Sequence, residues 1–163
     1  MDISRKTDYA LRMLAALVED PSGVVSVRTA ARENSVPYSF ARSIQHDLAV
    51  AGIVENTRGA NGGMRLAVDP RETTLLQVVE ALQGPVVVSC CANPAGDGTP
   101  CLNRPTCHFS PAWCNAELLL RSFFSSVTLH QLVVERLSPV FVGSFELVDD
   151  ERARELAAGM GGA

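Results

Sequence analysis

The chain has 163 residues and a mass of 17.4 kDa, which corresponds to one compact domain or a small domain with an appendage. Apolar residues make up 47% of it, enough for a hydrophobic core, so a disordered chain is excluded. It has no run of about 18 apolar residues, and its polar N-terminus lacks the apolar core of a signal peptide. We therefore expect a cytoplasmic protein without a membrane span.

The net charge of −4 argues on its own against a nucleic-acid partner, but the charge is unevenly distributed. Residues 1–66 carry a net charge of +1 and residues 67–163 a net charge of −5. Thirteen of the fourteen basic residues are arginines, which suit bidentate contacts with phosphates and guanine edges. The N-terminal part is thus compatible with DNA.

Two helices are predicted before residue 34. Apolar residues at helical spacing predict the first over residues 4–18, with Ser4 or Thr7 as its cap. A turn follows, and Ser26 can cap a short second helix over residues 27–33.

A third helix begins at Pro37, where the missing N–H of proline costs nothing. It is expected to run to about residue 51 and to stop at Gly52, a typical left-handed cap. The side of this helix away from its apolar stripe carries Ser39, Arg42, Ser43 and His46.

Two short strands are predicted next, over residues 53–56 and 64–68, with a glycine-rich tip between them. Helix, turn, helix and hairpin is the order of a winged helix-turn-helix, a mainly α fold with a small β-hairpin wing. In that fold the second helix of the pair enters the major groove, and the wing tip follows the DNA backbone or enters the minor groove. The alternative is a small helical scaffold with solvated polar residues. The DNA-contacting candidates are Ser39, Arg42, Ser43, Arg58, Gly59 and Asn61.

In the C-terminal half, Thr74 and Gln77 predict a capping box for a helix that ends at Gln83. A long helix is predicted from near Pro111, and Thr128 restarts a short one. The long helix has a heptad-like seam formed by Trp113, Ala116, Leu120, Phe123 and Val127. We expect a DNA-binding domain over 1–84, a cysteine-rich loop over 85–111, a dimerisation helix over 112–138 and a tail over 139–163.

All five cysteines lie between residues 90 and 114. In a cytosolic chain such a local group indicates metal or redox chemistry rather than disulfides. The pairs separated by two to four residues that structural zinc sites use do not occur here. Three well-spaced cysteines on a loop rich in proline and glycine suit an iron–sulfur cluster. Redox-active or inert thiols are the alternatives.

These features together resemble a family of winged-helix iron–sulfur regulators. The family includes the iron–sulfur biogenesis, nitric-oxide-sensing and rhizobial iron regulators. The resemblance covers about residues 1–137 and rests on the segments 4–12, 36–39, 57–63, 76–82 and 128–133 together with the cysteine loop.

The resemblance implies a homodimer in which the long C-terminal helix crosses between subunits. It also implies a [4Fe-4S] or [2Fe-2S] cluster held by Cys91, Cys101 and Cys107, with Cys90 as a one-residue alternative to the first. The fourth ligand implied by the nitric-oxide sensor is an aspartate of the first helix in the other subunit, which is Asp8 here. The competing interpretation of Asp8 is a surface ion pair with Arg12, four residues on.

The function expected is a dimeric DNA-binding transcription regulator, not an enzyme, that senses redox state, nitric oxide or iron through a cluster. Two alternatives stay open. One is a cluster-free regulator whose cysteines form a redox disulfide, with Cys90 or Cys114 as the resolving thiol. The other is a zinc or redox metalloprotein that binds no DNA.

Overall fold

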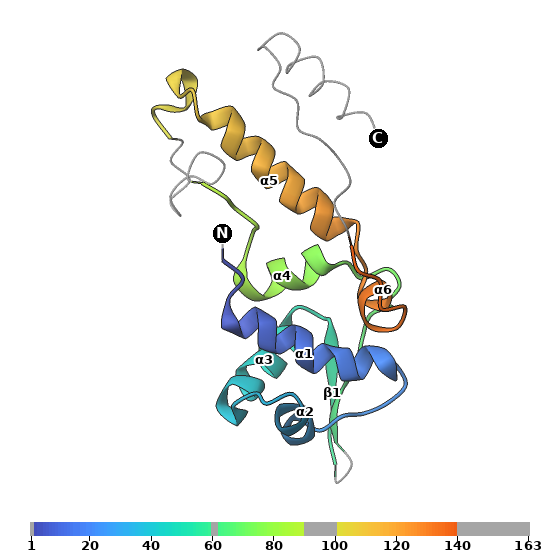
Figure 1. Ribbon diagram of the computed structural model, residues 1–163. Helices are drawn as coiled ribbons and strands as arrows, with labels where there is room; N and C mark the ends of the chain where they lie inside the picture. The colour runs from blue at the N-terminus through green and yellow to red at the C-terminus, as the bar shows by residue number, and fades with distance from the viewer. Residues whose placement is uncertain (1, 60–61, 90–100, 140–163) are drawn as a thin grey trace.

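The computed structural model describes residues 2–59, 62–89 and 101–139. This part of the chain is mainly helical with one two-stranded antiparallel hairpin, which confirms the predicted fold class. The helices α1 to α3 and the hairpin lie at one end of the molecule, and α5 extends away at the other end, beyond α4 (Figure 1). None of the described helices combines the length and apolarity needed to cross a membrane.

The first two helices start where a serine side chain satisfies a free backbone N–H. The helix α1 spans Arg5–Glu19, and the hydroxyl of Ser4 accepts a hydrogen bond of 3.1 Å from the N–H of Thr7. The helix α2 spans Val27–Glu33, and Ser26 caps it in the same way. Of the two predicted caps for α1, Ser4 is the one used.

The third helix, α3, spans Tyr38–Val50. Pro37 precedes it as the N-cap residue rather than forming its first turn, because its carbonyl accepts the first helical bond from Ala41 at 3.0 Å. The predicted stop is confirmed, since Gly52 has a φ of 71°.

The hairpin consists of β1 (Val54–Thr57) and β2 (Gly63–Leu66). Val54 lies opposite Leu66, and Thr57 lies opposite Gly63. The first strand lies one residue further along the chain than predicted. The second strand begins one residue earlier and ends two residues earlier than predicted. The side chain of Thr57 accepts a hydrogen bond of 3.1 Å from the N–H of Gly63, which closes the strands at the tip. A third segment joins the sheet edge through a bridge between Val25 and Met64.

The C-terminal half holds α4 (Leu75–Gln83), a 3-10 turn (Arg104–Thr106), α5 (Ser110–Ser125) and α6 (Leu129–Val133). Both Thr74 and Thr128 make the predicted kind of capping box with a glutamine three residues on.

One prediction for α5 is wrong. The helix ends at Ser125, so Val127, which was predicted as the last residue of its seam, lies outside the helix. Val127 lies in the break before α6 and is 7% exposed. Its carbonyl accepts the N–H of Leu75 at 2.8 Å, so it joins the core at the start of α4.

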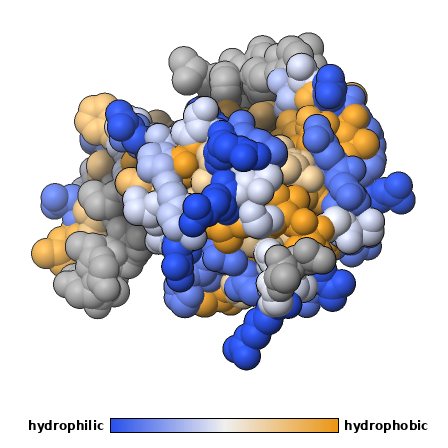
Figure 2. All heavy atoms as spheres, turned by 90° about the horizontal axis from the view of Figure 1, so that it is seen from below, coloured by the Kyte–Doolittle hydropathy of each residue, from blue (hydrophilic) through white to orange (hydrophobic). Residues whose placement is uncertain are grey.

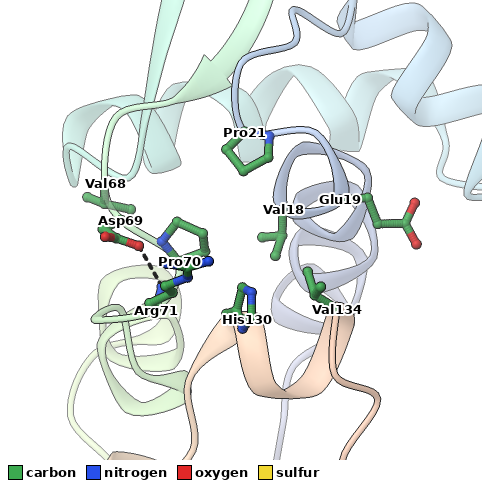
Figure 3. Close-up of a pocket in the computed structure, with 9 residues that line it drawn as sticks. All are labelled: Val18, Glu19, Pro21, Val68, Asp69, Pro70, Arg71, His130 and Val134. Carbon is green, nitrogen blue, oxygen red and sulfur yellow. Dashed lines mark hydrogen bonds between the residues drawn. The ribbon is translucent and has the colours of Figure 1, made fainter.

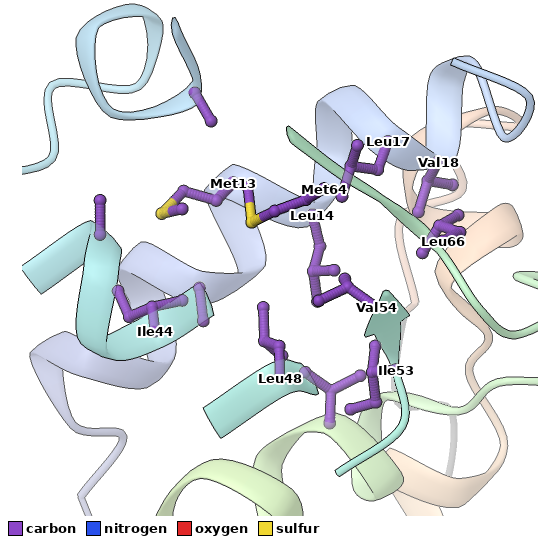
Figure 4. Close-up of a cluster of buried hydrophobic side chains, with 14 of the residues drawn as sticks. Met13, Leu14, Leu17, Val18, Ile44, Leu48, Ile53, Val54, Met64 and Leu66 are labelled. Carbon is purple, nitrogen blue, oxygen red and sulfur yellow. The ribbon is translucent and has the colours of Figure 1, made fainter. Parts of the chain in front are cut away.

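The core lies between α1, α3 and the hairpin (Figure 4). Met13 and Leu14 of α1 meet Ile44 and Leu48 of α3, all at most 1% exposed, while Met64 closes the core from β2. Because burying such a side chain contributes about 1.5–3 kcal/mol, this packing fixes α3 and the wing on one rigid support.

Candidate nucleic-acid interface and cysteine-rich segment

The turn between α2 and α3 fixes the angle at which the two helices meet. Asn34 ends α2, and its side-chain amide donates to the carbonyl of Ala30 at 2.9 Å. Ser35 adopts a left-handed conformation with a φ of 54°. The N–H of Val36 then bonds to the carbonyl of Ala31 at 2.8 Å, and the buried Val36 side chain anchors the turn in the core.

The two sides of α3 differ as the sequence predicts. Ala41 and Ile44 are fully buried against the core. The predicted DNA-contacting residues of this helix, Ser39, Arg42 and Ser43, are all exposed on its outward side, as is His46. Within the described residues no ion pair involves Arg42, so its guanidinium is available to an outside partner. The helix therefore presents one long cation between two small hydroxyl side chains, which permits close approach to a groove.

The wing is positioned by backbone contact rather than by side chains alone. The N–H of Val25 donates to the carbonyl of Met64 at 2.9 Å, and the N–H of Met64 donates back at 2.8 Å. A Cβ at Gly63 would overlap the carbonyl of Val25, so this approach requires glycine.

Near the tip, Gly59 has a φ of 116°, and Arg58 is exposed beside it. Asn61, the remaining wing candidate, lies outside the described residues. The face at this end of the molecule carries protruding hydrophilic side chains among smaller apolar patches (Figure 2).

The structure adds a residue pair that the sequence analysis missed. The guanidinium of Arg28, on α2, stacks over the ring of Tyr38 at 5.4 Å, and Tyr38 is the first residue of α3. Both line a shallow pocket of about 340 Å³ together with Arg32. The four-residue spacing of Arg28 and Arg32 on a short helix was the available signal, since it places both on one face. Arg28 and Arg32 thus place two positive charges of α2 beside Tyr38 at the start of α3.

The described cysteines are Cys101, Cys107 and Cys114, and all three are half-buried free thiols. Cys101 and Cys107 flank the 3-10 turn: the carbonyl of Cys101 accepts the N–H of Arg104 at 3.0 Å, and that of Cys107 accepts the N–H of Ser110 at 3.2 Å. Cys114 lies within α5. Cys90 and Cys91 lie outside the described residues. Thiolates are the donors that iron–sulfur clusters take, so Cys101 and Cys107 fit such a group in chemistry and accessibility.

The described residues alone do not complete a metal site, because they contain no group of three histidine, cysteine or acidic side chains that could hold an ion. Asp8, the predicted fourth ligand, makes an ion pair of 2.7 Å with Arg12 on the surface of α1. In the single chain, Asp8 therefore forms the surface ion pair with Arg12 that its four-residue helical spacing allows.

A separate pocket of about 470 Å³ lies between the end of α1, the loop after β2 and α6 (Figure 3). Val18 and Val134 line it with apolar surface, and the carboxylate of Glu19 points away from it. Its histidine, His130, bonds to Glu135 through Nδ1 at 3.0 Å. The pocket contains none of the predicted DNA or cysteine residues.

A helix-turn-helix whose second helix exposes Arg42 on its outward side, followed by an anchored hairpin, defines a winged-helix DNA-binding protein. Residues 3–135 match the Rrf2 family, described as "Iron-dependent Transcriptional regulator", and the chain belongs to this family. It is a DNA-binding transcription regulator and not an enzyme.

The "HTH-type transcriptional repressor NsrR" of Streptomyces coelicolor is 31% identical over 145 residues, covering 88% of this chain and 95% of its relative. Two solved structures share the fold. The global cysteine regulator CymR of B. subtilis has a TM-score of 0.66 at 24% identity, over 83% of this chain and 98% of CymR. The IscR of T. potens has a TM-score of 0.63 at 18% identity, over 88% of this chain and 94% of IscR.

Proposed function

We propose that this regulator is a homodimeric repressor that binds a double-stranded operator and whose affinity for it depends on an iron–sulfur cluster. The observation that carries the DNA part is the outward side of α3, where Arg42 stands between exposed serines while the opposite side is fully buried. Ser39, Arg42 and Ser43 read the major groove, Arg28 contacts phosphate, and the wing residues Arg58, Gly59 and Asn61 follow the backbone.

The dimer part is supported by the surface of α5. Trp113 is 44% exposed and Phe123 39%, and Leu118 and Leu119 are exposed as well. Large apolar side chains gathered on one helix mark an interaction site. We assign a second copy of the chain to this surface, with residues 1–84 as the DNA-binding unit and α5 as the dimerisation element.

The cluster is proposed to bind Cys91, Cys101 and Cys107, in the segment between 85 and 111. Support comes from the two half-buried thiols on either side of the 3-10 turn and from the similarity to NsrR. A bound cluster supplies a centre that reacts with oxidants or nitric oxide. Asp8 of the other subunit is the fourth ligand in this proposal. Because a carboxylate binds a soft centre more weakly than a thiolate, this ligand suits a sensor better than a permanent store.

The deciding experiment is anaerobic purification followed by an absorption spectrum and by iron and sulfide counts. We expect a coloured protein with equal iron and sulfide. A colourless protein with stoichiometric zinc would overturn the cluster. A metal-free protein that binds operator only after oxidation would instead support a thiol switch, for which Cys114 is an available free thiol.

Four variants then test the ligands under matched anaerobic conditions. Cys101→Ala and Cys107→Ala should abolish stable cluster binding, because each removes one of three proposed thiolates. Asp8→Ala should keep the cluster but shorten its lifetime. Cys114→Ala is the control and should behave as wild type. If Cys114→Ala loses the cluster while Asp8→Ala keeps it unchanged, Cys114 is the fourth ligand and the assignment of Asp8 is wrong.

A further inference from the structure

One side chain, that of Gln83, joins the start of α1 to the end of α4. Its Oε1 accepts the backbone N–H of Ser4 at 3.1 Å and the hydroxyl of Thr7 at 2.7 Å. Its Nε2 donates to the carbonyl of Asp2 at 3.2 Å. Figure 1 shows the N-terminus beside this end of α4, with α4 lying between α1 and α5. Three hydrogen bonds thus connect segments that are more than 75 residues apart in the sequence.

This connection is partly removed from water. Thr7 is fully buried although it carries a hydroxyl group, and Gln83 is half-buried. A buried hydroxyl needs hydrogen-bond partners, and those of Thr7 are Gln83 and the cap residue Ser4, 2.9 Å away. The position of the first turn of α1 therefore depends on the position of Gln83.

Beyond Gln83, the chain leads towards the cysteines, and two carboxylates hold it. Glu80 of α4 accepts the N–H of Val86 at 3.1 Å and also pairs with Arg121 of α5. Glu117 of α5 accepts the N–H of Val88 at 3.3 Å, two residues before Cys90. The segment 86–88 is therefore fixed to both α4 and α5. Any displacement of the following cysteine segment acts on these bonds.

On the other side, the first turn of α1 contacts the recognition helix. Lys6, next to Thr7, makes an ion pair with Asp47 of α3. Asp8, on the other side of Thr7, is the proposed cluster ligand. Thr7, which Gln83 holds, thus lies between Lys6, which contacts α3, and Asp8, the proposed cluster ligand.

We propose that Gln83 is a positioning residue that couples the cysteine segment to α3, through Thr7 and the Lys6–Asp47 pair. The proposal rests on the proposed cluster-dependent operator binding and adds the residue that transmits it. The physical basis is a series of hydrogen bonds and ion pairs between different elements, connected to one another through the backbones of α4 and α1.

The test compares operator affinity in two states of the whole protein, anaerobically purified with its cluster and cluster-free with reduced thiols. The probe is the duplex that the wild-type protein selects from a random-sequence pool, and the readout is the ratio of the two Kd values at one fixed salt concentration. We expect Gln83→Ala and the isosteric Thr7→Val each to move this ratio towards one by about 2- to 30-fold, the range for mutations within a coupling network. The double variant should add little, because both changes break the same link. Gln77→Ala is the matched control, since it removes a glutamine of the same helix whose side chain bonds, among the described residues, only to Thr74.

A wild-type ratio of one would overturn the proposed function and this inference together. A wild-type ratio well away from one that neither Gln83→Ala nor Thr7→Val changes would overturn the inference alone. Hydrogen exchange on the cluster-free protein gives an independent readout. In Gln83→Ala, amides of residues 4–8 and of residues 86–88 should both exchange faster than in Gln77→Ala. Faster exchange in only one of the two segments contradicts the link.

Discussion

The substitution Gly63→Ala tests how the wing is attached to the rest of the domain. An added Cβ at this position would overlap the carbonyl oxygen and carbon of Val25, which belong to the backbone and cannot rotate away. To make room, β2 must move away from Val25. That movement breaks the two hydrogen bonds between Val25 and Met64, which measure 2.9 and 2.8 Å.

The expected loss follows from those two bonds. At about 0.5–1.5 kcal/mol for each net hydrogen bond, their loss costs about 1–3 kcal/mol. Replacing glycine by alanine also restricts the unfolded chain, which returns about 0.4–1 kcal/mol. We expect a net destabilisation of about 1–2 kcal/mol, which lowers the Tm of a chain of this length by about 2–8 °C. Operator binding should weaken as well, because the root of the wing moves relative to α3.

The assay is urea and thermal unfolding followed by circular dichroism, with operator affinity measured on the same preparations. Gly23→Ala is the control. A Cβ at Gly23 would lie 2.5 Å from the carboxylate of Asp20, an exposed side-chain group that can rotate away from its hydrogen bond with Ser22, and 3.2 Å from the carbonyl oxygen of Asp20. This variant should be neutral or slightly stabilised. If Gly63→Ala is as stable as Gly23→Ala, the contact with Val25 does not anchor the wing.

Three further outcomes are expected. Arg42→Ala should relax base preference at particular operator positions by about 1–3 kcal/mol. Arg58→Ala should instead weaken binding to all sequences and reduce the slope of log affinity against log salt concentration by about one. Affinities for a series of substituted operators at several salt concentrations separate the two effects, and unchanged affinity in both variants contradicts the proposed placement of α3 and the wing on DNA. Phe123→Glu should shift the protein from dimer to monomer in sedimentation velocity without loss of helical signal, because it places a charge on the exposed apolar side of α5. A dimer of unchanged strength would exclude this side of α5 as the dimer interface. Thr128→Ala should cost about 0.5–2 kcal/mol in urea unfolding, since it removes the oxygen that accepts the N–H of Gln131 at 3.2 Å. A loss below this range would show that the cap does not stabilise α6.

Features that depend on near neighbours in the chain could be predicted from the sequence. The caps at Ser4, Ser26 and Thr74 are set by a side-chain oxygen and a backbone N–H three residues on, so spacing alone reveals them. The stop at Gly52 follows from the conformational freedom of glycine. The outward position of Arg42 follows from the period of the helix, since its buried side is marked by apolar residues.

Features that depend on distant segments were decided by the tertiary structure. Val127 looked like the next residue of a helical seam, but a partner at the start of α4 draws it into the core. Gly63 was predicted as part of the glycine-rich tip, whereas the backbone of Val25 makes it a close-approach position within β2. The proposed cysteine ligands show the same limit, because their spacing indicates soft-metal chemistry without giving the distances between thiols. Gln83 gave no signal in the sequence, since its partners are 76 to 81 residues away and a helical glutamine is ordinarily solvated. Local periodicity specifies which side of an element is apolar, but only the folded chain specifies what that side, or a polar group beside it, will meet.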